Sequence, residues 1–538
     1  MNVGRRTSSA AGLVIGLMVA LGPWATTGAA AGAEAGPLPV EDARALKAGF
    51  KAIDDGKPKQ ARSAEAGIKD PVAAKLLRWA RLVAPDPNAS FDEIAGFMAD
   101  NPAWPDQRGL QRRAEEAMTP TMPDDKVLAW FGDRAPVSGD GQARLGAALL
   151  ATGDVHKGEE VLKRAWINGD FTKHRERAFY KRHRRLLTLE DHRRRLDRLL
   201  WEGRYWPARR ILWKVKPDYR ALSVARLALR FDRGHVDRLI AKVPDKLKSH
   251  PGLVYERLRW RRRKGKDASA RELLENPPPD LVHPRRWWKE RVVLARRALY
   301  KGHVTAAYGL ARDHGLDGGA AFAEAEWLAG WIALRFLRDP TAAKRHFMAM
   351  YAAVNYPVSR ARGAYWTARA MEPAGETDMA ESWYGLAAQF PTTYYGQLAI
   401  TRIRPGANLE LIEGPAPSHE EIKAFEALEP VRAVRILGEI GEHDRLRPFI
   451  LGLDEMAESP GWRLLTAELA RANERPDLAV LIAKRAHREG WRFPHVAFPE
   501  MIPSPMDIKG ASAAVEGPLI LAVVRQESAF NVKAKSHA

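Results

Sequence analysis

The chain has 538 residues and a mass of 60.0 kDa, with 46% hydrophobic and 28% charged residues. This ordinary globular composition excludes a mainly disordered chain and a protein with many membrane spans. The 86 Lys and Arg residues outnumber the 66 Asp and Glu residues, giving a net charge of +20 that favours polyanions such as nucleic acid, anionic lipid or an acidic cell-wall polymer. The chain has no cysteine, which excludes disulfides, thiolate metal sites and a cysteine nucleophile.

The first segment has the pattern of an export signal. Arg5 and Arg6 precede an apolar stretch from Ala10 to about Leu21, and a run of small residues at 26–31 offers cleavage sites. The apolar stretch is shorter than the roughly 20 residues that a membrane span needs, which argues against the alternative of an anchor helix. We therefore predict a signal peptide over residues 1–31 and a periplasmic location. Export also argues against nucleic acid as a partner.

The segment from about Val40 to Glu489 has a helical pattern almost throughout, and a small or polar turn recurs along it. After the first gap the turns follow one another at about 31–37 residues, the length of a helix-turn-helix repeat. The turns are Gly153-Asp154, Gly203-Arg204, Gly234-His235, Gly265-Lys266, Gly302-His303, Asp339-Pro340 and Gly375-Glu376. The fold class predicted from this period is all-α, an α-superhelix (solenoid) of helix-turn-helix repeats.

Aromatic and alanine positions repeat within this array. Two successive repeats share a Trp, an Ala and a Pro at matching places: Trp331, Ala333 and Pro357, then Trp366, Ala368 and Pro391. Alanine at such spacings lets helices approach closely, and the aromatic rings fill the space between layers. We therefore expect most of the 17 Trp residues to lie in the core between hairpins.

Two strongly basic runs, 173–198 and 256–266, are predicted to be mainly solvated helix faces with ion pairs, and part of them to contribute to a binding surface. His174, His183 and His192 lack metal-ligand spacing with nearby carboxylates, so we expect them at the surface and predict no metal site. Motifs for zinc peptidases, phosphate-binding loops, dinucleotide-binding loops and serine-hydrolase elbows are absent. No cofactor is predicted.

Proline-rich stretches divide the chain after the repeats. We predict a helical repeat domain over residues 35–398 and a helical linker domain over 399–498. A segment that is rich in proline and non-helical, 493–505, then leads into a last part, 499–538.

The last part contains the strongest candidate for chemistry. Pro518 stands where a helix can begin, and the apolar run Leu519–Val524 predicts that this helix is largely buried. Glu527 follows the run, and desolvation beside a buried helix would favour its protonated form. A protonated carboxyl can donate its proton to the leaving oxygen of a glycoside. The alternative for an isolated Glu-Ser pair is a solvated helix end.

The segment around Glu527 resembles the start of the catalytic domain of the soluble lytic transglycosylases, whose pattern runs roughly R-Q-E-S-x-F-N-P-x-A-x-S-x-A. Val532 departs from it, standing where that family usually has proline. The pattern is met at Arg525, Gln526, Glu527, Ser528, Phe530, Asn531, Ala534, Ser536 and Ala538. Segments at the end of the repeats resemble the same family, namely Ala364–Ala370, Trp383–Ala388 and Pro391–Ala399.

The resemblance implies cleavage of the β-1,4 bond between N-acetylmuramic acid (MurNAc) and N-acetylglucosamine (GlcNAc) in peptidoglycan, with 1,6-anhydromuramoyl ends as product. It implies that Glu527 is the catalytic acid and base, and that residues 499–538 are the first part of a lysozyme-like domain. Ser528 would shape the site by bonding Glu527 or substrate, or would only bond the helix end. Phe530 is expected in the domain core. The implied partner is the glycan strand, and we expect a monomer; contacts with peripheral membrane or cell-wall proteins stay open.

The chain stops at Ala538, where that family continues with G-A-x-G-L-M-Q. We therefore expect a fragment of a longer protein, with little or no catalytic activity as it stands, because a short segment cannot form a closed cleft. The alternative function is an exported, basic α-solenoid that binds peptidoglycan or a partner protein without chemistry. A nucleic-acid-binding repeat protein fits the charge but not the export signal.

Overall fold

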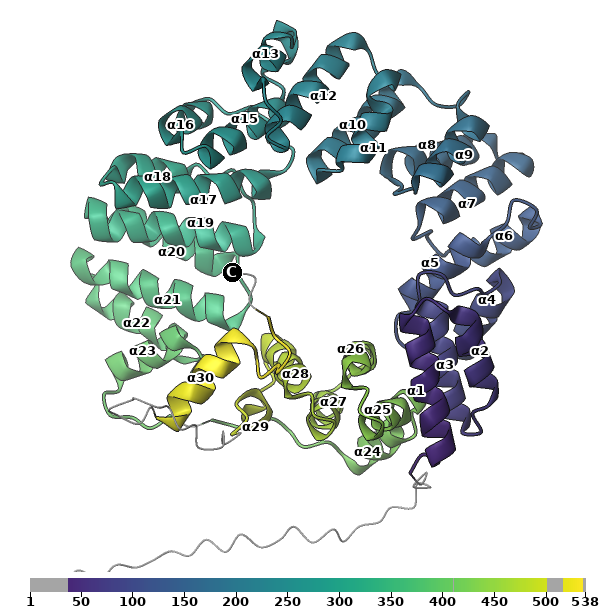
Figure 1. Ribbon diagram of the computed structural model, residues 1–538. Coiled ribbons are helices and arrows are strands. Elements are labelled where there is room, and N and C mark those ends of the chain that lie inside the picture. The colour runs from purple at the N-terminus through teal and green to yellow at the C-terminus, as the bar shows by residue number, and fades with distance from the viewer. Residues whose placement is uncertain (1–36, 410, 501–515, 536–538) are drawn as a thin grey trace, which may run out of the picture. The chain divides into compact units, whose positions relative to one another are not determined.

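The structure is a computed structural model that describes residues 37–535, apart from residue 410 and residues 501–515. The predicted export signal lies outside these residues. The chain from Leu38 onward forms one compact unit, whose helices follow one another in Figure 1. Its described residues contain thirty α-helices, four short 3-10 or π segments and no strand, so the predicted all-α class is confirmed. None of the described helices has both the length and the apolar character to cross a membrane.

Twenty-three helices make up the long array before residue 404. They are α1 (Val40–Asp54), α2 (Pro58–Ala66), α3 (Pro71–Val83), α4 (Phe91–Asp100), α5 (Gln107–Ala117), α6 (Asp124–Phe131), α7 (Gly139–Ala151), α8 (Val155–Asn168), α9 (Lys173–His183), α10 (Leu189–Glu202), α11 (Tyr205–Ile211), α12 (Pro217–Arg230), α13 (Val236–Ala241), α14 (Asp245–Lys248), α15 (Pro251–Arg263), α16 (Asp267–Glu275), α17 (Pro284–Tyr300), α18 (Val304–Arg312), α19 (Gly319–Ile332), α20 (Pro340–Ala352), α21 (Pro357–Met371), α22 (Thr377–Ala388) and α23 (Tyr394–Ile403).

Seven helices follow the array. They are α24 (His419–Glu426), α25 (Glu429–Glu439), α26 (Leu446–Glu455), α27 (Pro460–Ala472), α28 (Pro476–Arg488), α29 (Pro494–Ala497) and α30 (Gly517–Glu527). The short helix α29 lies in the stretch that was predicted to be non-helical, since a proline is accepted in the first turn of a helix.

Six of the seven predicted turns lie between helices, and the seventh, Asp339-Pro340, lies at the start of α20. Gly203 shows why glycine recurs there, because it ends α10 with a φ of 76°, a left-handed conformation that costs other residues more. Gly375 ends the turn before α22 with the same φ of 76°. The spacing of these turns therefore did identify the helical hairpins.

The predicted aromatic layers are present between the hairpins. Trp287 is fully buried in the core formed by α15–α19, and Trp327 and Trp331 stack with ring centroids 5.8 Å apart. Trp366 of the next repeat meets Trp327 edge to face at 6.0 Å. In contrast, Trp206 and Trp213 are largely exposed, so the core does not account for every tryptophan.

The helices after the array contact its first helices. The backbone N–H of Leu38 donates to the carboxylate of Glu439 at 3.0 Å. Glu429 of α25 accepts hydrogen bonds from Lys75 at 2.7 Å and from the indole of Trp104 at 3.0 Å. The array therefore returns on itself, and α1–α5 share one core with α24–α29.

A single aromatic side chain occupies the centre of this shared core. Phe449 of α26 is fully buried, and its ring meets Trp79 of α3 edge to face at 4.7 Å. The ring of Trp104 lies 5.6 Å from the same side chain. Apolar and aromatic packing thus joins the first and the later helices more extensively than the few polar contacts do.

The prediction that the basic runs are surface elements is wrong for part of the run 173–198. His183 and His192 are buried, and only His174 is exposed as expected. The indole of Trp166 donates to Nδ1 of His192 at 3.0 Å, and the buried Arg195 donates to Glu176 at 3.2 Å. Partners on neighbouring helices thus satisfy part of the polar groups of His192 and Arg195, and the ring of His183 packs against Phe179 with centroids 4.9 Å apart.

Because His192 is buried, we expect it to make the free energy of unfolding depend on pH. Burial, and then the nearby charge of Lys214, lowers the pKa of His192 from 6.5 to about 4. Its stabilisation is therefore complete above pH 6.5 and is lost as the pH falls through 4, by up to about 3 kcal/mol. We expect His192→Asn, whose amide oxygen can still accept from Trp166, to remove this share of the pH dependence in urea unfolding.

The matched control for this prediction is His174→Asn, because His174 is exposed. This variant is expected to keep the pH dependence of the parent protein. An unchanged slope between pH 6.5 and 4 in His192→Asn would contradict the buried, neutral state of His192.

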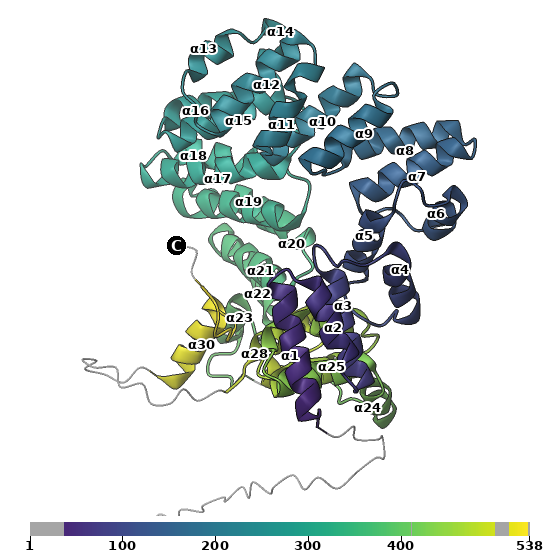
Figure 2. The same cartoon turned by 45° about the vertical axis from the view of Figure 1, so that its right-hand side comes forward.

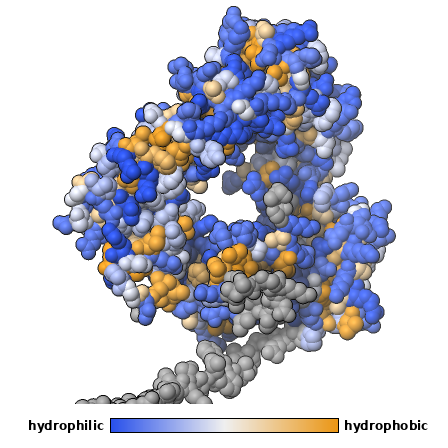
Figure 3. Space-filling model, turned by 60° about the vertical axis from the view of Figure 1, so that its left-hand side comes forward, coloured by the Kyte–Doolittle hydropathy of each residue, from blue (hydrophilic) through white to orange (hydrophobic). Residues whose placement is uncertain are grey.

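The surface of the unit agrees with the charge of the chain. The face in Figure 3 is mostly hydrophilic, and its hydrophobic residues form separate patches. Many basic side chains are held in ion pairs between neighbouring hairpins, such as Arg230 with Glu256 at 2.6 Å and Arg297 with Asp267 at 2.8 Å. The rest of the positive charge is available for solvent and ligands.

Candidate active site

Helix α30 carries the predicted catalytic glutamate at its last position. Pro518 lies in its first turn, where the missing N–H costs nothing, and the helix ends at Glu527. The next turn is sharp, since Ala529 and Phe530 both have a positive φ, of 50° and 67°. Two successive left-handed residues that are not glycine store strain, which often accompanies functional sites. The chain therefore leaves α30 in a fixed direction directly after the motif.

Glu527 is exposed and forms no hydrogen bond or ion pair with any of the described residues. The prediction that α30 is largely buried is wrong: the helix has no buried residue, and Leu519 and Val523 are each more than half exposed. The apolar run is thus partly exposed and partly half-buried, and no core of the described chain encloses it.

The neighbouring residues of the motif have local roles. The hydroxyl of Ser528 donates to the backbone oxygen of Val524 at 3.1 Å, which is the helix-end bond considered as one of its two roles. Phe530 is buried, as expected. Neither residue contacts Glu527 through an interaction within the described chain. The motif therefore presents one free carboxylate on an ordered turn.

Arg525 attaches α30 to the helices before it. Its Nε donates to the backbone oxygen of Ala497 at 2.7 Å, and its guanidinium lies 4.2 Å from the ring centre of Phe498. Burial lowers the pKa of Arg525 below its usual value. Figures 1 and 2 both show α30 beside the end of the array and near α28. The arginine of the motif thus positions the helix whose end carries Glu527.

A cavity of about 390 Å³ lies beside Arg525, between α21, α28, α29 and α30 and the turn before α23. Sequence reasoning did not assign a role to its other basic residues, Lys484, Arg488 and Arg492. Their positions in the sequence gave no signal, because the cavity forms only when segments more than a hundred residues apart meet.

No group of three or more His, Asp or Glu side chains in the described residues is placed to hold a metal ion. The motif offers the carboxylate of Glu527 for acid and base chemistry. A single exposed carboxylate can donate and accept a proton, provided that further groups hold a substrate against it.

The fold defined by these helices is an α-superhelix of stacked hairpins. No known protein-family profile and no curated protein sequence matches the chain. Among solved structures, the 70 kDa soluble lytic transglycosylase Slt70 of Escherichia coli matches with a TM-score of 0.59 at 16% identity, over 92% of this chain and 78% of that one. The complex of the 70 kDa soluble lytic transglycosylase with bulgecin A matches with a TM-score of 0.59 at 17% identity, over 93% and 79%.

An inactive mutant of the lytic transglycosylase Slt of Pseudomonas aeruginosa matches with a TM-score of 0.65 at 17% identity, over 92% of this chain and 78% of that one. At these low sequence identities, the structural similarity establishes the fold alone. The chain therefore has the helical superhelix fold of the soluble lytic transglycosylases, and the resemblance predicted from the sequence is confirmed at this level.

Proposed function

We propose that this protein is a lytic transglycosylase of peptidoglycan that cleaves the bond between MurNAc and GlcNAc. The proposal rests on two features that occur together in this chain. The motif Arg525–Asn531 lies at the end of α30, after a superhelix with the fold of Slt70. The fold comparison rests on the arrangement of the backbone and the motif rests on the identity of side chains, so their agreement along one chain supports one function.

In the proposed reaction a single carboxylate acts twice. Glu527 donates its proton to the glycosidic oxygen, which leaves on GlcNAc as a hydroxyl. The resulting carboxylate then takes the proton of the C6 hydroxyl of MurNAc as that oxygen attacks C1. The product is a 1,6-anhydro sugar, and no water enters the reaction. This explains why one carboxylate suffices, in contrast to the usual pair in glycosidases.

The remaining motif residues and domains follow from the same proposal. Ser528 would contact the substrate or the catalytic carboxyl once a glycan strand is bound. Residues 35–398 would form the repeat domain, 399–498 the linker domain and 499–538 the start of a lysozyme-like catalytic domain. The predicted export signal over 1–31 would deliver the protein to the periplasm, where peptidoglycan is its partner. The protein would act as a monomer.

The test is the product formed from purified sacculi by the protein expressed from its complete gene. We expect soluble muropeptides that end in 1,6-anhydro-MurNAc, identified by mass spectrometry, because an internal hydroxyl replaces water as the nucleophile. Products with ordinary reducing ends would contradict the transglycosylase proposal in favour of hydrolysis. Binding to sacculi without any release would contradict the enzyme proposal and support the binding scaffold.

A further inference from the structure

The cavity beside α30 has an unusual balance of charge. Four cationic side chains line it, Lys484 and Arg488 of α28, Arg492 after α28 and Arg525 of α30, together with His487. Among the described residues, no Asp or Glu lines this cavity. The charged groups that line the cavity are thus all positive, and such a surface attracts anions.

None of these four cations has an ion pair within the described chain, in contrast to their neighbour Arg485, which pairs with Asp454 at 2.6 Å. Burial, and then the charges of Arg525 and Arg488, lowers the pKa of Lys484. Burial and the charges of Arg492 and Arg525 likewise lower the pKa of His487. The positive groups are therefore close enough to repel one another.

The arginines of the cavity are held in place by groups other than carboxylates. The guanidinium of Arg488 lies 4.6 Å from the ring centre of Tyr356. Arg492 donates to the backbone oxygen of Gln389 at 3.2 Å. Such contacts fix the planes of the guanidinium groups while their other N–H groups stay available to accept an oxyanion.

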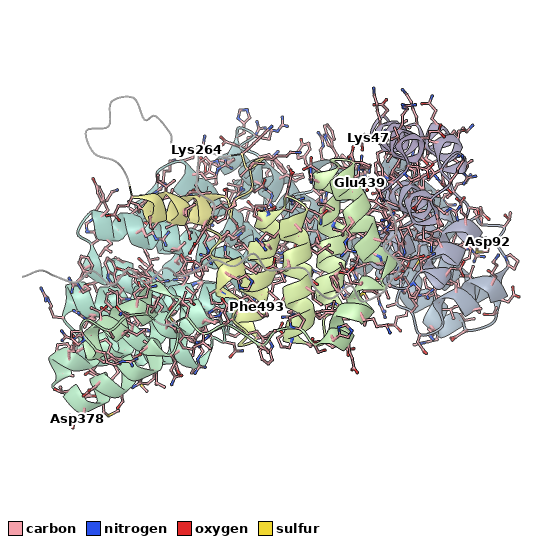
Figure 4. All side chains as sticks on the ribbon, turned by 90° about the horizontal axis from the view of Figure 1, so that it is seen from below. Lys47, Asp92, Lys264, Asp378, Glu439 and Phe493 are labelled. Atoms are coloured by element: carbon pink, nitrogen blue, oxygen red, sulfur yellow. The ribbon has the colours of Figure 1, made fainter. Side chains whose placement is uncertain are left out.

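The rest of the lining suits an organic anion. The hydroxyls of Ser359 and Thr392 can hydrogen-bond to oxygens, and Phe493 offers an apolar wall. Figure 4 marks Phe493 within this region of the unit. A volume of about 390 Å³ falls within the range of pockets that hold small molecules.

We propose that this cavity binds a multiply charged oxyanion through Lys484, Arg488 and Arg492. Carboxylates and phosphates share the chemistry that these groups recognise, and either a peptide rich in carboxylates or a phosphorylated polymer can supply it. Because Arg525 lines the same cavity, a bound anion also ties α30, and with it Glu527, to α28. The proposal does not depend on the proposed function, since binding is measured without turnover.

The experiment is isothermal titration of the purified protein with two probes, the free tetrapeptide of peptidoglycan and inorganic pyrophosphate. We expect binding of at least one probe that weakens with added salt. The double variant Lys484→Gln/Arg488→Gln is expected to weaken it at least about tenfold, because each charged hydrogen bond contributes on the order of a factor of ten. Both side chains are exposed and form no described ion pair, so the variant is expected to fold.

The matched control is Arg44→Gln/Lys47→Gln, which removes the same charge from exposed positions on α1 that also have no described ion pair. Figure 4 shows Lys47 on the N-terminal helices, away from Phe493. If the tetrapeptide binds and only the cavity variant loses this binding, peptide carboxylates are the source of the bound oxyanion. If only pyrophosphate binds, the source is a phosphate group. Absence of binding by both probes, or equal binding by both variants, would overturn the proposal.

Discussion

In the protein expressed from its complete gene, replacing Glu527 by glutamine is expected to lower the release of anhydromuropeptides from sacculi by about 10²–10⁴-fold, the usual contribution of a positioned acid or base. The amide keeps the shape of the side chain but can neither donate the carboxyl proton nor take a proton back. Glu527 is exposed and has no partner among the described residues, so its loss leaves no buried group unpaired. The variant is therefore expected to fold and to lose only the chemical step.

The control for this prediction is Glu455→Gln, which neutralises another exposed carboxylate, at the end of α26. It is expected to release product at the parent rate, measured by mass spectrometry of the same sacculi. Thermal unfolding by circular dichroism is expected to be equal for the parent and both variants. Full activity of Glu527→Gln would remove Glu527 from the catalytic role.

Replacing Phe449 by alanine is expected to lower the free energy of unfolding by about 3–5 kcal/mol, the cost of removing a buried aromatic side chain. Phe449 is fully buried and contacts both Trp79 and Trp104. Its removal leaves a cavity between the first helices and α26, where the array returns on itself. Urea unfolding followed by circular dichroism measures this change.

Phe449→Leu provides the graded comparison, because it keeps most of the apolar volume in the same core. It is expected to cost clearly less than the alanine variant. Equal stability of Phe449→Ala and the parent protein would mean that the first and later helices are not joined through this core.

The period of the fold could be predicted from the sequence because its turns carry distinctive residues. Gly203 and Gly375 adopt a positive φ at the ends of helices, and a Pro after Asp339 starts the next helix. Such residues act locally, so they mark the same structure in every repeat. The aromatic layers followed from the same logic, because Trp331 and Trp366 occupy matching places in successive hairpins.

The candidate site was only partly predictable. Glu527 and Ser528 could be predicted because they belong to a short motif. The apolar run before them predicts that they lie at the end of a helix. The exposure of Leu519 and the burial of His192 could not be predicted, because both depend on what other helices supply. A run of apolar residues indicates a helix that can be buried, and only tertiary contacts decide whether it is.

The basic cavity could not be predicted from the sequence either. In the sequence, Lys484 and Arg488 have the pattern of two solvent-exposed cations on a helix. Arg525 is recognised there only as a residue of the motif. Their proposed role comes from meeting around one cavity, which no carboxylate of the described residues lines. Such a convergence of like charges has no signature along the chain, since each contributing segment is ordinary by itself.

The return of the array on itself also dictates an order of events as the chain is made. Leu38 and Glu439 are hydrogen-bonded partners that lie 401 positions apart. At about 5–20 residues per second, the ribosome takes on the order of a minute to supply the second partner after the first. During that time the faces of Trp79 and Trp104 that meet Phe449 have no cover. The first helices thus complete their core only after α26 has emerged, which makes the closing contact the slow, non-local step of folding.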